Sequence, residues 1–160
     1  SEVRFNPMSY HNGSIWPHDN ALIAAGLSRY GLTAEAQQPF SALLAASAFL
    51  DLQRLPELYC GFDRRPGEGP TLYPVACLPQ AWAAGSPFML LQALLGLRVS
   101  ARACEVRFDN PVLPESISEL RIRNLIVGQA SIDLLLERHP HDVGITVLRR
   151  EGKIGAVVTK

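Results

Sequence analysis

The stretch YHNGSIWPHDN at residues 10–20 stands immediately before an apolar run at residues 21–25. It combines two imidazoles, an indole, a carboxylate and two amides. Asp19 or Asn20 is suited to cap a helix, because a short side-chain oxygen accepts the free N–H groups of a first turn. The apolar run predicts a buried helix that closes at Gly31. The polar stretch is therefore expected to form a loop at a helix N-terminus, where a rigid scaffold positions functional side chains.

Composition restricts the class of protein. The 160 residues are 48% hydrophobic, which is enough to bury a core and argues against disorder. Lys and Arg together number 15, as do Asp and Glu, so the net charge is zero. A protein that binds nucleic acid or an anionic membrane broadly needs a basic excess, so neither is expected as a partner. No apolar run reaches the roughly 18 to 20 residues of a bilayer span.

The cysteines and the first residues indicate the cellular setting. Cys60, Cys77 and Cys104 are odd in number and widely spaced, which is not the pattern of a disulfide framework and favours the cytoplasm. The chain begins at Ser1 in the middle of a pattern, with no signal peptide visible. These features predict a segment of a longer cytoplasmic protein.

Two helical runs follow the opening stretch. Residues 34–52, after Thr33 as an expected N-cap, are almost all helix formers, and Pro39 predicts a late start or a kink. Residues 80–95 form the second run, which the Gly-Ser-Pro triplet at residues 85–87 should bend or split. Both runs are apolar around most of their circumference, which indicates helices that pack on more than one side.

The pattern changes near residue 98, and from about Val99 the apolar period falls towards two. Strands are expected in four segments: residues 119–125, 131–137, 144–148 and 154–158. Residues 150–153 should form a hairpin turn between the last two. The chain is thus expected to be α+β, with a helical part at 1–97 and an antiparallel β part at 98–160.

The least regular segment, RLPELYCGFDRR at residues 54–65, carries residue types that suit a carbohydrate. Its aromatic faces can stack on sugar rings, and its carboxylates and arginines can bond hydroxyl groups. Glu57 follows a proline, so helix propensity does not account for it. The alternative is a surface glutamate paired with Arg54 or Arg64, since exposed ion pairs are common.

Two further features have simpler interpretations. His11 and His18 are seven residues apart, unlike the i, i+4 pair of a helical zinc site, and neither a metal nor another cofactor is expected. Trp82 lies in an alanine-rich helix, a position more typical of a core residue than of a ligand contact. Residues 80–86 of that helix could nevertheless approach the pocket.

Four motifs together resemble a known family. They are YHNGSIWPHDN at 10–20, LPELYCG at 55–61, YPVAC at 73–77 and PQAWAAGS at 79–86. In this order they resemble bacterial glycogen-debranching, amylo-α-1,6-glucosidase-like proteins, which belong with the inverting glycosidases built on a six-fold α/α barrel. The resemblance covers residues 10–97 and, more loosely, NPVLP at 110–114. It implies the last helices of such a barrel, followed by a small antiparallel β unit.

The resemblance also implies roles for individual residues. Inverting glycosidases use a carboxylic acid and a carboxylate base roughly 6.5 to 9.5 Å apart, with the attacking water between them. Glu57 matches the base, and the acid is expected upstream of Ser1, so the isolated chain should be inactive. Trp16 should stack on the sugar, while His18 and Asp19 hold its hydroxyl groups. The remaining substrate-binding residues implied are His11 and Tyr59.

Two functions therefore stay open. The chain either supplies the base and part of the sugar pocket of a glycoside hydrolase acting on α-glucosidic linkages, or is a non-catalytic carbohydrate-binding or scaffolding module. The two differ in what Glu57 does. The expected partners are an α-glucan or oligosaccharide, the rest of the barrel, and a second copy that covers exposed helix faces.

Overall fold

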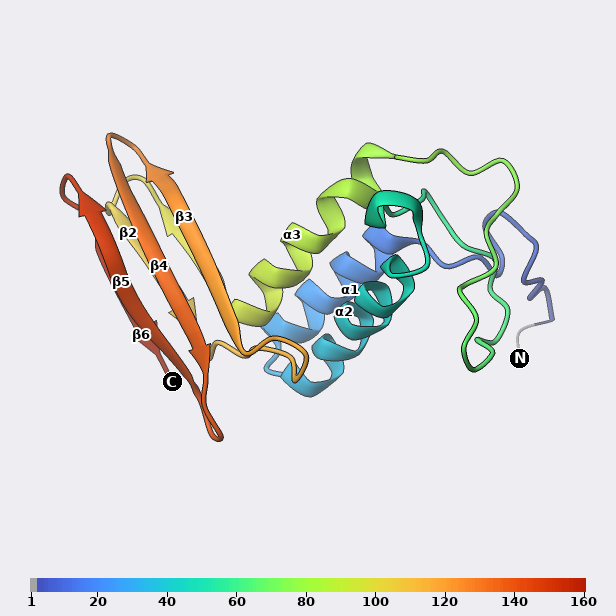
Figure 1. The fold of residues 1–160 in the computed structure, drawn as a ribbon, viewed down its shortest axis with the longest axis horizontal. Helices are drawn as coiled ribbons and strands as arrows, with labels where there is room; N and C mark the ends of the chain where they lie inside the picture. The colour runs from blue at the N-terminus through green and yellow to red at the C-terminus, as the bar shows by residue number, and fades with distance from the viewer. Residues whose placement is uncertain (1–2) are drawn as a thin grey trace. The chain divides into compact units, whose positions relative to one another are not determined.

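The structure is a computed structural model that describes residues 3–160. The chain divides into two compact units, Ser1–Leu91 and Gln92–Lys160 (Figure 1). The first unit holds the helices that precede the division, and the second holds the strands. The division falls within the third helix, α3 (Ala81–Leu95).

The first unit is built on α1 (Pro17–Arg29) and α2 (Thr33–Ser47), which pack against each other. The side chains buried on these helices are mostly small or aromatic: Ala21, Ala24, Ala36, Phe40, Leu43 and Ala46. Alanines let two helix backbones approach closely. After α2 comes one 3-10 turn, η1 (Asp51–Gln53), and then the irregular segment that precedes α3.

Helix α1 begins earlier than the capping argument predicts. Trp16 is the N-cap residue and Pro17 occupies the first helical position, where its fixed φ suits a helix and its missing N–H costs nothing. Asp19 lies inside the first turn, where its charge is favourable to the helix dipole. The prediction that Asp19 or Asn20 caps the helix was therefore wrong. Gly31, with φ +79°, closes the C-terminal end as expected.

The other two helices also differ from expectation. Helix α2 starts at Thr33 itself, contains Pro39 and ends at Ser47, five residues before the predicted end at residue 52. Leu52 has φ 54°, outside the right-handed helical region, so α2 cannot continue through it. Helix α3 runs through Pro87 as one element. The Ser86 hydroxyl donates to the Trp82 carbonyl, one turn before Ser86, at 2.9 Å.

The second unit contains two three-stranded sheets. One sheet has the order β1-β2-β6, from β1 (Leu97–Ser100), β2 (Glu105–Asp109) and β6 (Gly155–Thr159). The other has the order β3-β4-β5, from β3 (Glu119–Val127), β4 (Ala130–Arg138) and β5 (Val143–Glu151), and all its pairings are antiparallel.

Alternating apolar residues give this unit its core. On β4, Ile132, Leu134 and Leu136 are fully buried, as the period of two along a strand requires. Val106 and Phe108 of β2 belong to the same apolar cluster, so residues of both sheets share one core. This shared apolar core holds the two sheets of the second unit together.

Two parts of the expected fold are wrong. Residues 3–160 hold three α-helices and two three-stranded sheets, so they do not form part of a recognisable six-fold α/α barrel. The β part is not wholly antiparallel either, since β2 and β6 pair in parallel. The turn at 150–153 therefore joins strands of different sheets instead of closing a hairpin. The physical reason is that a β-branched run predicts that a segment forms a strand, whereas contacts with residues far away in the sequence determine which strand it pairs with.

None of the helices in residues 3–160 combines the length and the apolar character that crossing a membrane requires.

Candidate functional site

Backbone hydrogen bonds bring three distant segments of the first unit together. Ile15 and Tyr59 exchange both of their backbone hydrogen bonds, each at 2.9 Å. Tyr59 also forms a bridge with Leu72 on its other side. The Glu57 N–H donates to the Cys77 carbonyl at 2.9 Å. The polar stretch before α1, the segment around Glu57 and the segment before α3 thus lie side by side.

Glycines allow two of these segments to touch. A Cβ on Gly61 would lie 1.7 Å from the carbonyl oxygen of Gly13, far inside van der Waals contact. The Gly61 N–H donates to the Pro7 carbonyl at 2.9 Å in the same place. A side chain at residue 61 would push the segment of Glu57 away from the polar stretch.

Glu57 is buried, with 9% of its surface exposed, and both of its carboxylate oxygens accept hydrogen bonds. The Tyr10 hydroxyl donates to Oε1 at 2.5 Å, and the Cys77 N–H donates to Oε2 at 3.2 Å. The bond from Tyr10 is the main cause that holds the pKa of Glu57 below its usual value, followed by the bond from Cys77. Glu57 is therefore an ionised carboxylate at neutral pH, held by Tyr10 and Cys77 and not by the arginines of the alternative interpretation.

Tyr10 connects Glu57 to a group of aromatic rings. Its hydrogen bond to Glu57 raises the pKa of the phenol to about 12, so the hydroxyl remains a donor. Its ring lies edge-on to His11 at 4.7 Å and to Trp16 at 4.8 Å between centroids, and Tyr73 follows at 5.7 Å. The carboxylate and the indole that the sequence singled out are thus joined through one side chain.

Trp16 is held by one hydrogen bond and by neighbouring rings. Its Nε1–H donates to the Tyr10 carbonyl at 3.2 Å. His11 lies nearly parallel to the indole at 6.2 Å, and His18 lies edge-on at 5.5 Å. The structure therefore brings His11, Trp16 and His18 into one aromatic group beside Glu57.

His18 extends this group towards α3. Its ring is edge-on to Trp82 at 4.6 Å, and its Nε2 lies 3.2 Å from a carboxylate oxygen of Asp19. Trp82 is 66% exposed, so the interpretation of Trp82 as a core residue was wrong. The Nδ1 atom of His18 is buried and has no hydrogen-bond partner among residues 3–160.

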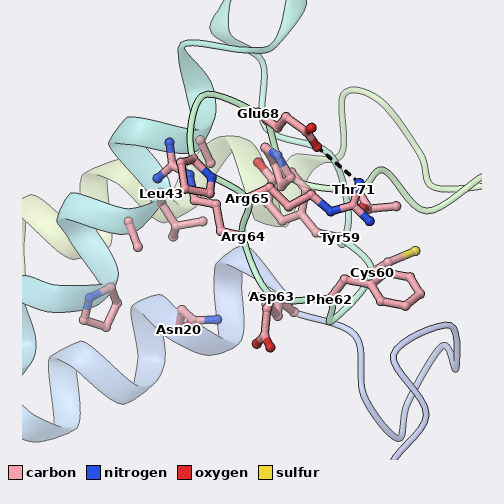
Figure 2. Close-up of a pocket in the computed structure, with 17 residues that line it drawn as sticks. Asn20, Leu43, Tyr59, Cys60, Phe62, Asp63, Arg64, Arg65, Glu68 and Thr71 are labelled. Carbon is pink, nitrogen blue, oxygen red and sulfur yellow. Dashed lines mark ion pairs between the residues drawn. The ribbon is translucent and has the colours of Figure 1, made fainter.

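Tyr59 differs from the other predicted site residues in what its side chain contacts. It is 2% exposed and lines a cavity of about 700 Å³ between α1, α2 and the segment at 59–71 (Figure 2). The other five predicted residues do not line this cavity: Glu57, Trp16, His18, Asp19 and His11. Burial raises the pKa of the Tyr59 phenol to about 12.

Sequence reasoning missed Tyr10 and Cys77 as the groups that hold Glu57. Tyr10 is the first residue of the polar stretch, and a phenol in such a stretch is a signal for a hydrogen-bond donor. Tyr10 and Glu57 are 47 residues apart in sequence, so the sequence did not indicate that Glu57 accepts the hydrogen bond from Tyr10. Cys77 acts mainly through its backbone N–H, which no side-chain pattern reports.

In the part of the chain that the structure describes, no group of three His, Cys, Asp or Glu side chains is placed to hold a metal ion. No protein-family model and no curated protein matches this chain. Inferences about its function therefore depend on the residues and their geometry.

Proposed function

We propose that this chain supplies the general base and part of the sugar-binding surface of a glycoside hydrolase that acts on α-glucosidic linkages with inversion. The observation that supports the proposal best is the Glu57 carboxylate, kept ionised by Tyr10 beside the aromatic group of Trp16. The motifs shared with glycogen-debranching, amylo-α-1,6-glucosidase-like proteins support the choice of an α-glucan as substrate.

A general base must be unprotonated and must have a free lone pair. Each carboxylate oxygen can accept two hydrogen bonds, and within residues 3–160 the hydrogen bonds from the Tyr10 hydroxyl and from the Cys77 N–H reach one oxygen each. Each oxygen therefore keeps a lone pair that can accept a proton from water. In the proposed reaction, water loses this proton to Glu57 as it attacks the anomeric carbon, and a carboxylic acid protonates the departing glycosidic oxygen. We propose that this acid comes from outside residues 1–160, as the family resemblance implies.

The aromatic group offers the surface that a sugar ring needs. Indole and imidazole faces can stack on the C–H groups of a pyranose, and Trp16 and Trp82 both contact His18 edge-on. The Asp19 carboxylate, whose side chain is 58% exposed, can bond sugar hydroxyls. These residues are proposed to orient the sugar while Glu57 orients the water.

A second candidate is a carbohydrate-binding or scaffolding module that cleaves nothing. The observation that favours it is that Glu57 joins two segments, through Tyr10 and through Cys77. A carboxylate in that position would stabilise the loop even if no reaction took place. The two candidates predict different results when the carboxylate alone is removed.

The deciding experiment is Glu57→Gln in the full-length protein. The amide oxygen can accept from the Cys77 N–H while the amide NH2 donates to the Tyr10 hydroxyl, so the fold should survive, whereas the amide cannot take up a proton. We expect kcat on a malto-oligosaccharide or glycogen to fall about 10²- to 10⁴-fold with sugar binding retained. The matched control is Glu35→Gln, an exposed position in the first turn of α2, which should turn over as the parent does.

Unchanged turnover in Glu57→Gln, with the thermal midpoint also unchanged, would reject the assignment of the base. The anomer released by the parent protein gives a second check. Inversion at an α-linkage yields β-glucose first, which proton NMR detects before mutarotation; release of α-glucose would contradict the mechanism.

We also propose a cytoplasmic location, supported by three cysteines that are all free in the structure: Cys60, Cys77 and Cys104.

A further inference from the structure

The sheet β1-β2-β6 leaves the outer edge of β6 without a neighbouring strand. β6 is the last strand in that order, so within residues 3–160 only its β2 side is paired. The Gly155 N–H donates to the Cys104 carbonyl and the Asn110 N–H donates to the Thr159 carbonyl, each at 2.8 Å. Both ends of β6 therefore direct their backbone groups towards β2.

The backbone groups of β6 divide between its two sides. Along a strand, successive residues direct their N–H and C=O groups to opposite sides. Gly155 and Thr159 face β2, so Val157, midway between them, faces β2 as well. Ala156 and Val158 then face outward. Their two N–H and two C=O groups form the outer edge of the sheet.

The other three sheet edges within residues 3–160 have features that hinder pairing with a further strand. β3 and β5 each shift register against β4, which marks a bulge. β1 has only four residues, and one of them is Arg98, whose side chain is 72% exposed. β6 contains no register shift, no charged residue and no proline. Because bulges and charges are what block pairing between edges, β6 is the edge that is open to another strand.

The chemistry of β6 fits a second copy of the same strand. A two-fold axis at Val157 would place Ala156 of one copy opposite Val158 of the other, and the reverse. Each of these two pairs would exchange both of its hydrogen bonds, so every outward backbone group of Ala156 and Val158 would be satisfied. β6 carries no charge that would meet its own copy across the axis, and the chain has a net charge of zero, so the copies do not repel each other overall.

We propose that β6 is the interface of a homodimer, in which two copies of β6 pair antiparallel about a two-fold axis at Val157. The pairing joins two three-stranded sheets into one continuous sheet. Because the same surface is used by both copies, the assembly closes at two and does not extend into a filament. The proposal does not depend on the activity of Glu57.

The size of the contact sets its strength. Each strand has five residues and is about 17 Å long, so the pair buries less than the roughly 1,200 Å² of a stable interface. The dimer therefore forms and dissociates with protein concentration, with a dissociation constant of about 1 μM or weaker.

Hydrogen exchange of the 160-residue chain, followed by NMR over a series of protein concentrations, tests the pairing. The Ala156 and Val158 amides should exchange rapidly when dilute and become protected by about tenfold or more when concentrated. The Val157 amide bonds β2 in both states, so it is the internal control and should not change comparably. Sedimentation velocity on the same samples should show monomer giving way to dimer.

Val158→Lys tests the edge directly, because a lysine on an edge strand hinders pairing. This variant should remain monomeric throughout the series, and its protected Val157 amide should show that β6 still pairs with β2. Val99→Lys is the matched control, since Val99 is 48% exposed and Val158 is 42% exposed, and they lie on the two edge strands of one sheet. The control should dimerise as the parent does.

Val158→Pro is a second variant, which removes one outward N–H without adding charge. Proline is accepted in an edge strand where its missing N–H would face solvent, so the fold should survive and the dimer should be lost.

A parent chain that stays monomeric over the whole series would overturn the inference. So would a dimer in which the Ala156 and Val158 amides exchange as fast as in the monomer. Dimerisation of Val158→Lys at the parent's concentrations would contradict it as well. An equal loss of dimer in Val99→Lys and Val158→Lys would also count against it, because β1 lies at the opposite edge of the sheet.

Discussion

The β3-β4-β5 sheet and the segments around Glu57 are held in place by different means. In the sheet, a regular ladder and an alternating apolar face bury Ile132, Leu134 and Leu136 together. Around Glu57, the chain depends on isolated bridges and on single side-chain bonds such as the one from Tyr10. The comparison shows that cooperative packing stabilises the β unit, whereas individually placed contacts determine the geometry of the candidate site.

The largest expected effect tests the packing of the β3-β4-β5 sheet. Leu134→Ala removes a fully buried side chain of β4 and leaves a cavity, which should reduce the free energy of unfolding by about 2 to 5 kcal/mol. Chemical denaturation monitored by hydrogen exchange of the β4 amides measures it. Leu148→Ala on β5 is the matched control, because Leu148 is 52% exposed, and it should change stability by only about 0.5 kcal/mol or less. Equal effects at the two positions would contradict the assigned core.

A smaller effect is expected where two segments of the site touch. Gly61→Ala places a methyl group against the Gly13 carbonyl, and the resulting shift should reduce stability by about 1 to 3 kcal/mol. It should also weaken the bond between Tyr10 and Glu57. Thermal unfolding and the NMR signal of the Glu57 carboxyl group measure the two effects.

Gly26→Ala is the control for Gly61→Ala. Nothing lies within 4 Å of a Cβ at Gly26, which is inside α1, so this substitution should stabilise the chain by up to about 1 kcal/mol. If both variants behaved alike, the close approach of the two segments would be wrong.

The smallest change removes one hydroxyl group from the site. In Tyr10→Phe the pKa of Glu57 should rise towards its usual 4.5, because the hydrogen bond that favours the ionised form is gone. If Glu57 is the base, kcat of the full-length protein should fall about tenfold, and the acid limb of its pH profile should move to higher pH.

Stability provides a second measurement on Tyr10→Phe. A lowered carboxyl pKa contributes stability that is present above the unfolded value of 4.5 and is lost as pH falls through the folded value. The parent should therefore lose more stability on acidification than Tyr10→Phe does. Tyr73→Phe keeps the aromatic contact with Tyr10 and should behave as the parent. A Glu57 pKa that is the same in the parent and Tyr10→Phe would show that Tyr10 does not hold the carboxylate.

Sequence patterns predicted the strands of the β unit well. The segments expected at 119–125, 131–137 and 144–148 lie inside β3, β4 and β5, and the one at 154–158 is β6 displaced by one residue. Alternation along a strand is a local property, so a single sequence reveals it. The short strands β1 and β2 were missed, although Val106 and Phe108 of β2 do alternate with polar residues.

Long-range features were not predictable in the same way. The sequence offered two signals for the start of α1: Pro17 as the first helical residue, and Asp19 or Asn20 as the cap. The structure uses Pro17. The wrong prediction of a barrel was based on motifs in loops, and such motifs carry no information on the number of helices. For the candidate site, the sequence singled out Glu57 and Trp16, but not Tyr10 as the residue that joins them, because that contact spans 47 residues.

The parallel pairing of β2 and β6 has a consequence for biosynthesis. Val106 pairs with Ala156, so β2 emerges from the ribosome long before its neighbour has been translated. Until residues 155–159 appear, β2 has only β1 beside it and exposes a row of unpaired amide and carbonyl groups to other nascent chains. A message truncated before codon 155 should therefore yield a polypeptide that self-associates, although most of its apolar core residues are already present.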